Sequence, residues 1–97
     1  MLQKPLLAVF SDDNSAALEI QIGYPEVAEV DWRCSAQIVG LHPRSRYLVG
    51  IDPWQALQLA QQYVLNELKS LIEQGARLQT SDGEYSLTLA ELFTTLQ

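Results

Sequence analysis

Three side chains, Cys34, His42 and Asp52, are of the types that can form a nucleophile, a general base and an orienting carboxylate. Their sequence surroundings favour structural roles instead. Cys34 falls on the same face of a predicted strand as Trp32, where a thiol behaves as a small buried hydrophobe. His42 precedes a proline in a predicted turn, and Asp52 is placed to cap a helix. We therefore predict no catalytic residue. The alternative is a small ligand-binding domain or enzyme with a pocket near Trp54, Cys34 and His42.

Metal and cofactor sites are not indicated by the spacing of the remaining polar residues. One cysteine and one histidine cannot form a zinc site without carboxylates, and no C-x-x-C or H-x-x-x-H spacing is present. The segment S-D-G-E at 81–84 is too short for a calcium loop. The five glycines are scattered, so no phosphate-binding loop is formed. We expect no metal and no cofactor.

The 97 residues carry a net charge of −6, and the negative charge is concentrated near the N-terminus. Residues 1–31 hold six carboxylates against one lysine. An acidic chain without a basic stripe is a poor candidate for binding nucleic acid or an anionic membrane. A basic protein partner would suit this charge, with Glu19, Glu26 and Glu29 as contact residues, although solvated turns and one polar sheet face are the simpler explanation.

Several features of the composition bear on the compartment. No apolar run reaches the roughly 18 residues of a membrane span, and the apolar run near the N-terminus lacks a signal-peptide cleavage pattern. A single cysteine allows no internal disulfide, which fits a reducing environment. We expect a cytoplasmic protein that forms one domain over residues 1–97.

The longest periodic segment, residues 51–74, predicts an α-helix. Asp52 is suited to the N-cap position, with Pro53 in the first turn and Gln55 placed to reach back to the N–H of the cap residue. Gly75 supplies a stop signal. The apolar stripe predicted to pack on the rest of the protein is Leu57, Ala60, Val64, Leu68 and Leu71.

Leu59 and Tyr63 do not belong to that apolar stripe. They lie four residues apart, so they share one side of the predicted helix, beside its polar face. They form either a packing surface for the C-terminal segment or an exposed contact for a partner. In the second case the partner is either another protein or a second copy of this chain. We therefore expect a monomer or a homodimer.

Four stretches before the predicted helix are predicted to form strands: residues 5–11, 17–24, 30–41 and 46–51. The second and third alternate apolar and polar side chains, which is typical of strands with one wet face. Short polar turns between the strands favour an antiparallel meander, and its apolar face needs a cover. We predict an α+β fold in which a four-stranded antiparallel meander is followed by the long helix, packed on one face (β-β-β-β-α). Beyond Gly75 we expect a short helix with Leu89, Leu92, Phe93 and Leu96 on one side, or a hairpin between residues 77–80 and 85–87.

Two blocks of the sequence resemble a known pattern. They are W-R-C-S-A-Q-I-V-G-L at 32–41 and G-I-D-P-W-Q-A-L-Q-L-A at 50–60. They resemble a family of short bacterial proteins of unknown function with the pattern WxC, IxGL and G[IV]DxxQALxLA. The resemblance implies a sheet followed by a helix and a bacterial origin, and it brings no activity. We therefore expect a non-enzymatic protein-binding module, for example an immunity or adaptor protein of a bacterial operon.

Overall fold

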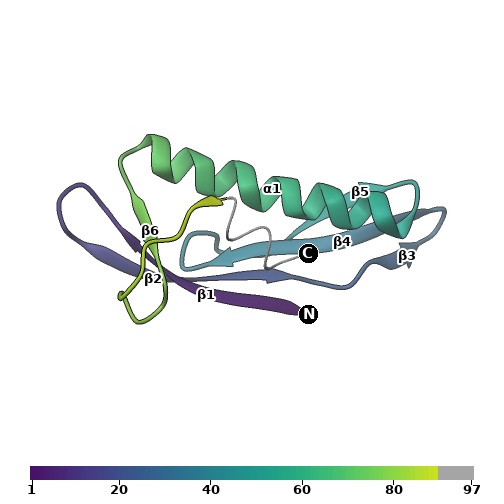
Figure 1. The fold of residues 1–97 in the computed structure, drawn as a ribbon. Coiled ribbons are helices and arrows are strands. Elements are labelled where there is room, and N and C mark those ends of the chain that lie inside the picture. Colours follow the sequence, from purple (N-terminus) through teal and green to yellow (C-terminus); the bar gives the residue numbers. More distant parts are fainter. Residues whose placement is uncertain (90–97) are drawn as a thin grey trace.

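The structure is a computed structural model that describes residues 1–89 (Figure 1). Its elements follow the chain in the order β1 (Leu2–Val9), β2 (Ser15–Ile22), β3 (Glu26–Ala28), β4 (Asp31–Val39), β5 (Arg46–Gly50), α1 (Pro53–Glu73) and β6 (Arg77–Gln79). One antiparallel sheet and one long helix make up this part of the chain, and the predicted α+β class is confirmed.

Within residues 1–89 the sheet contains six strands, so the predicted number of four was wrong. The meander itself is present, because β1 pairs with β2, β2 with β4, and β4 with β5. The first additional strand, β3, runs along the same edge of β4 as β2. Strand pairing stops near Pro25, which has no N–H to donate, and it resumes at Glu26.

The second additional strand, β6, pairs with β1. It corresponds to the first strand of the predicted hairpin, residues 77–80. After a turn, the chain returns to β6, where Gln79 forms an antiparallel bridge with Ser86. The Leu87 N–H also donates to the Leu78 carbonyl at 2.8 Å. The predicted C-terminal helix, apart from Leu89, lies outside the described residues.

One face of the sheet is covered by α1, which packs on β4 and β5 and lies above the sheet in Figure 1. The buried core comes from alternate strand residues and one side of the helix: Leu6, Ala8, Leu18, Ile20, Ile22, Cys34, Ala36, Ile38, Ala56, Ala60, Val64, Leu68, Leu71, Ala76 and Leu78. Tyr24, predicted on the inner face of the second strand, is 72% exposed because β2 ends at Ile22.

A close approach between β5 and the helix depends on Gly50. A Cβ atom at this position would lie 2.6 Å from the backbone nitrogen of Ala56. Only a residue without a side chain lets the first turn of α1 rest directly on the end of β5. Gly50 therefore determines where the helix begins relative to the sheet.

Candidate functional site

Exposed apolar side chains gather at one end of the molecule. The β3–β4 turn, the end of β5 and the start of α1 meet there, at the right of Figure 1. We call this surface the apolar end and define it by five exposed residues: Val27, Val30, Val49, Ile51 and Trp54. Val30 is 89% exposed and Trp54 is 69% exposed. Such large apolar side chains lose favourable burial energy when they face water.

Strand register and helix capping hold the apolar end together. Trp32 of β4 pairs with Val27 on one side and Gly50 on the other, so the ends of β3 and β5 flank the same residue. Ile51 follows Gly50 directly and leads into the helix cap. The end is therefore built from two stretches that are distant in sequence, residues 27–32 and 49–54.

The helix cap fixes the backbone between Ile51 and Trp54. The Asp52 carboxylate accepts a hydrogen bond of 2.7 Å from the Gln55 N–H. Gln55 Oε1 in turn accepts a bond of 2.8 Å from the Ile51 N–H. The sequence had placed this second bond on the N–H of Asp52 itself. The side chain instead reaches one residue further back, and it thereby ties the end of β5 to the helix.

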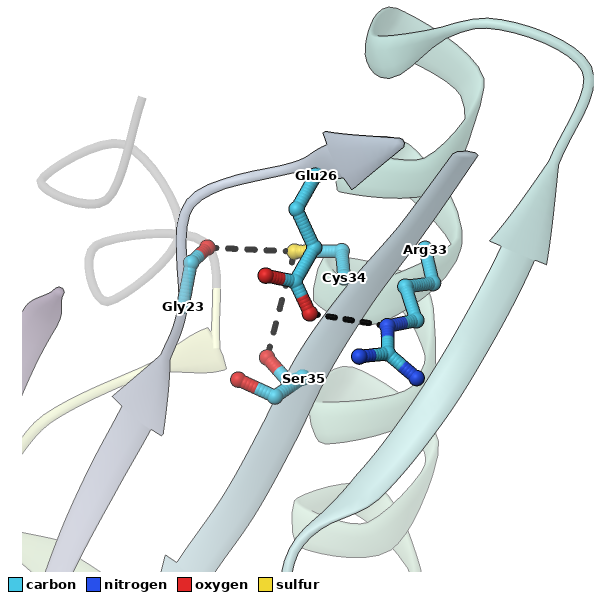
Figure 2. Close-up of polar contacts among 5 residues, drawn as sticks. All are labelled: Gly23, Glu26, Arg33, Cys34 and Ser35. Carbon is cyan, nitrogen blue, oxygen red and sulfur yellow. Dashed lines mark hydrogen bonds and ion pairs between the residues drawn. The ribbon is translucent and has the colours of Figure 1, made fainter. Parts of the chain in front are cut away.

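A shallow hollow of about 380 Å³ opens at the apolar end, lined by Ala28, Glu29, Val30, Asp31, Arg33 and Val49. Arg33 is held in place from two sides. Its Nε donates to Glu26 Oε1 at 2.7 Å, as Figure 2 shows. Its guanidinium carbon also lies 4.4 Å from the centre of the Tyr47 ring. Glu29, Asp31 and Asp52 add further carboxylates around the apolar end, so its rim is acidic.

The predicted contact residues are distributed over different surfaces. Glu26 and Glu29 belong to the rim of the apolar end. Glu19 lies on the helix-free face of the sheet and accepts a hydrogen bond of 2.9 Å from Gln21. Leu59 and Tyr63 lie on the side of α1 next to β5, because the Arg46 guanidinium of β5 is 5.3 Å from the centre of the Tyr63 ring.

Cys34, His42 and Asp52 are not brought together. Cys34 is fully buried, and its thiol donates to the Gly23 carbonyl at 3.1 Å, with a longer contact of 3.8 Å to the Ser35 carbonyl (Figure 2). Burial raises the pKa of the Cys34 thiol, which lowers the fraction of reactive thiolate. His42 and Asp52 lie beyond opposite ends of β5, whose five residues span roughly 16 Å. A triad of these three side chains is therefore incompatible with the fold.

His42 belongs to a different cluster, which the sequence did not reveal. Its Nδ1 accepts the Ile38 N–H at 3.2 Å, and its Nε2 lies 3.6 Å from Glu67 Oε1 of α1. Its ring is 5.6 Å from that of Tyr63. Burial, followed by the charge and the hydrogen bond of Glu67, raises the pKa of the Tyr63 hydroxyl, while Arg46 opposes this shift. These contacts attach the β4–β5 loop to the helix.

Within residues 1–89, no three side chains of the metal-binding types gather so that they could hold a metal ion. This part of the chain also has no helix with the length and apolar character needed to cross a membrane. A second open hollow, of about 440 Å³, lies beside β6 and is lined by Ile72, Ala76, Arg77, Leu78, Ser86, Leu87, Thr88 and Leu89. Neither Cys34, His42 nor Trp54 lines it.

Comparison with known proteins places almost the whole described chain in one family. A family model described as "Domain of unknown function (DUF6968)" matches residues 4–89. The matched range begins in β1 and extends past β6, so it includes every element of the fold. No curated protein and no solved structure matches the chain. The expectation of a family without an assigned function is thereby confirmed.

Proposed function

We propose that this chain, which belongs to the family described as "Domain of unknown function (DUF6968)", is a protein-binding module without catalytic activity. The apolar end is its contact surface. An immunity or adaptor protein of a bacterial operon, acting in the cytoplasm, is the role that fits such a module. The observation that carries the proposal is that five apolar side chains at one end of the fold, Trp54 among them, are exposed.

Apolar side chains scattered singly over a surface need no explanation, but a cluster with a polar rim is typical of protein interaction sites. The five residues of the apolar end come from two stretches, residues 27–30 and 49–54, that meet at one end of the fold. Tryptophan is also among the residues that most often dominate binding energy at interfaces. The capped first turn of α1 fixes the backbone of Trp54, so binding has to order only its side chain.

The rim determines which kind of partner would fit. Glu29, Asp31 and Asp52 have no ion pair with another described residue, whereas Glu26 is paired with Arg33. A partner with an apolar centre and a basic border would complement this arrangement. Charges of opposite sign speed the encounter and are screened over about 8–10 Å at physiological salt. Association should therefore slow steeply as salt is raised.

Site-specific photo-crosslinking in the native host tests this proposal. A photo-reactive amino acid at position 54 should capture one protein in a defined ratio. The same amino acid in place of Lys69, which lies on the exposed outer side of α1, should not. Capture must be lost when Ile51 is changed to Lys in the position-54 variant, because the added charge lies inside the contact. Equal capture from positions 54 and 69 would contradict the apolar end as a binding surface.

The captured partner then allows the charge prediction to be measured. Charge reversal at Glu26 and Glu29 should reduce mainly the association rate with the purified partner, and the salt dependence should become shallower. Glu19→Lys provides a matched control on the helix-free face, away from the apolar end. An association rate that does not change with salt would show that the acidic rim is only solvated surface.

A further inference from the structure

The outer edge of β5 carries backbone groups that pair with no other strand of residues 1–89. The Gly23 N–H donates to the Ser35 carbonyl at 2.9 Å, so the backbone groups of Ser35 point toward β2. Backbone groups alternate in direction along a strand, so those of Cys34 and Ala36 point toward β5. Through the β4–β5 register, Arg46, Leu48 and Gly50 pair with β4, while the N–H and C=O groups of Tyr47 and Val49 point outward.

No other strand among residues 1–89 pairs with this outer edge. Figure 2 shows β5, in pale teal, on the outer side of β4. The usual devices that block an edge are proline, lysine, a bulge or an inward-pointing charge, and none of them occurs within Tyr47–Gly50. Tyr47 and Val49 are 50% and 57% exposed, so an apolar surface accompanies the free backbone groups. The edge is thus suited to pair with another strand.

We propose that β5 pairs antiparallel with β5 of a second copy of this chain. The pairing has a two-fold axis at Leu48, so that one sheet continues through two subunits. Tyr47 then lies opposite Val49 of the partner subunit, and Val49 opposite the partner's Tyr47. Each of these two pairs exchanges two backbone hydrogen bonds, so every outward-pointing group of both strands is satisfied.

The side chains of β5 also suit this register. On the helix-free face, each Tyr47 lies opposite Val49 of the partner subunit, so the junction contains two such pairs. An aromatic residue opposite a β-branched residue is a favourable cross-strand pair. On the helix side, Leu48 meets the partner's Leu48. Arg46 lies opposite the partner's Gly50, so the two arginines are at opposite ends of the junction and do not repel one another directly.

The helices leave room for such a junction. Because α1 packs on both β4 and β5, its axis lies near the boundary of these two strands. With strands about 4.8 Å apart, the two symmetry-related helices would be roughly 10 Å from each other, which is within the usual range for packed helices. The side of α1 that carries Leu59 and Tyr63 lies toward β5 and would be covered by the partner's helix. A second copy thus explains why apolar residues occur on that side.

The dimer is a separate inference from the proposed function. In an antiparallel pairing the two apolar ends point in opposite directions along the joined strands. Val49 takes part in the junction, and the other four residues of each apolar end stay accessible. Failure of one proposal therefore leaves the other untouched.

Sedimentation at micromolar concentration tests the proposal with the full chain. The protein should sediment with twice the chain mass of 10.9 kDa. Val49→Pro removes the outward N–H of both copies, hence two intermolecular hydrogen bonds, while the pairing with β4 is retained. It should weaken dimerisation roughly tenfold to a hundredfold.

Leu59→Glu should give a folded monomer, whereas Gln58→Glu, with the same new charge on the outer side of the helix, should remain a dimer.

A disulfide experiment tests the register directly. Leu48 faces its own copy in a pair without hydrogen bonds, where the Cα atoms are about 4.5 Å apart and within reach of a disulfide. Leu48→Cys should therefore form a covalent dimer on mild oxidation. Val49→Cys should not, because its copies are offset by two positions and about 8 Å apart. The native Cys34 is buried and serves as an internal control.

Several outcomes would overturn the proposal. One is a monomeric full chain. A monomer that becomes a dimer when the chain ends at Leu89 would show that residues 90–97 occupy the edge instead. A dimer that resists both Val49→Pro and Leu59→Glu would use another surface. If Val49→Pro fails to fold, as judged by circular dichroism, Leu59→Glu and the cysteine variants still decide the question.

Discussion

The two edges of the sheet are built in opposite ways. At the β1 edge, β6 pairs with Leu7 and Val9, and the chain around Leu87 covers β6 in turn. The uncovered part of β1 presents outward only the backbone groups of Gln3 and Pro5, and the proline has no N–H to offer. The β5 edge presents two complete sets of groups on Tyr47 and Val49. In the part of the chain that the structure describes, one edge is therefore closed to a further strand and the other is open.

The difference shows that one edge of this small sheet contributes mainly to folding stability, whereas the other is available for association. The closed edge is held by buried side chains such as Leu78 of β6. The open edge is held by α1 from one face only, and Leu48 of β5 is half-buried. Removing side chains should therefore affect folding mainly at the closed edge and association mainly at the open one.

The largest effect is expected from a cavity at the closed edge. Leu78→Ala removes a side chain that is fully enclosed, and it should lower the free energy of unfolding by ~2–5 kcal/mol. Leu48→Ala is the matched change at the open edge. Because Leu48 is only partly buried, its loss should be about 1–2 kcal/mol. Urea unfolding at low protein concentration, where association is suppressed, measures both. Equal losses would show that the two edges contribute alike to the core.

An intermediate effect is expected where α1 begins. Asp52→Ala removes the acceptor of the Gln55 N–H and should cost about 1 kcal/mol. For a domain of this size that corresponds to a decrease in melting temperature of roughly 4–8 °C. Asp52→Asn keeps a capping oxygen and should stay close to the wild type. If Asp52→Ala leaves the melting temperature unchanged and yet abolishes binding to the partner, Asp52 is a contact residue rather than a cap.

The smallest effect on folding is expected at Pro5. Pro5→Val restores an outward N–H on β1 without touching the core, so the free energy of unfolding should change by no more than about 0.5 kcal/mol. The variant should nevertheless associate or aggregate more readily, because the closed edge now offers a second place for strand pairing. Light scattering against concentration measures this, with Pro43→Val in the β4–β5 loop as control. An unchanged association would mean that Gln3 and Lys4 suffice to block the edge.

The main elements of the fold could be read from local patterns. Period-two alternation identified the strands around Ile20 and Ala36, and the Asp52–Pro53 signal identified the start of α1. The extra strands could not be read in this way. β3 and β6 are three residues long, too short for any periodicity, and they exist because β4 and β1 offer edges to pair with.

The candidate site was predictable only in part. Glu26 and Glu29 were noted for their charge, and the structure places them at the rim of the apolar end. The exposure of Ile51 and Trp54 was not foreseen, because apolar residues next to a helix cap look like core residues in the sequence. Tyr63 was noted as out of register with the apolar stripe, but its contacts with His42 and Arg46 depend on how the helix lies over the sheet.

The sequence by itself determined the local choices: where strands alternate, where the helix is capped, and that one face of each is apolar. These follow from the side chains and backbone preferences of neighbouring residues. Only the tertiary structure decided which strand edge is closed and which apolar residues stay exposed. Strand pairing joins residues distant in the chain, such as Val9 with Arg77 and Glu19 with Val39, and no local pattern encodes such partners.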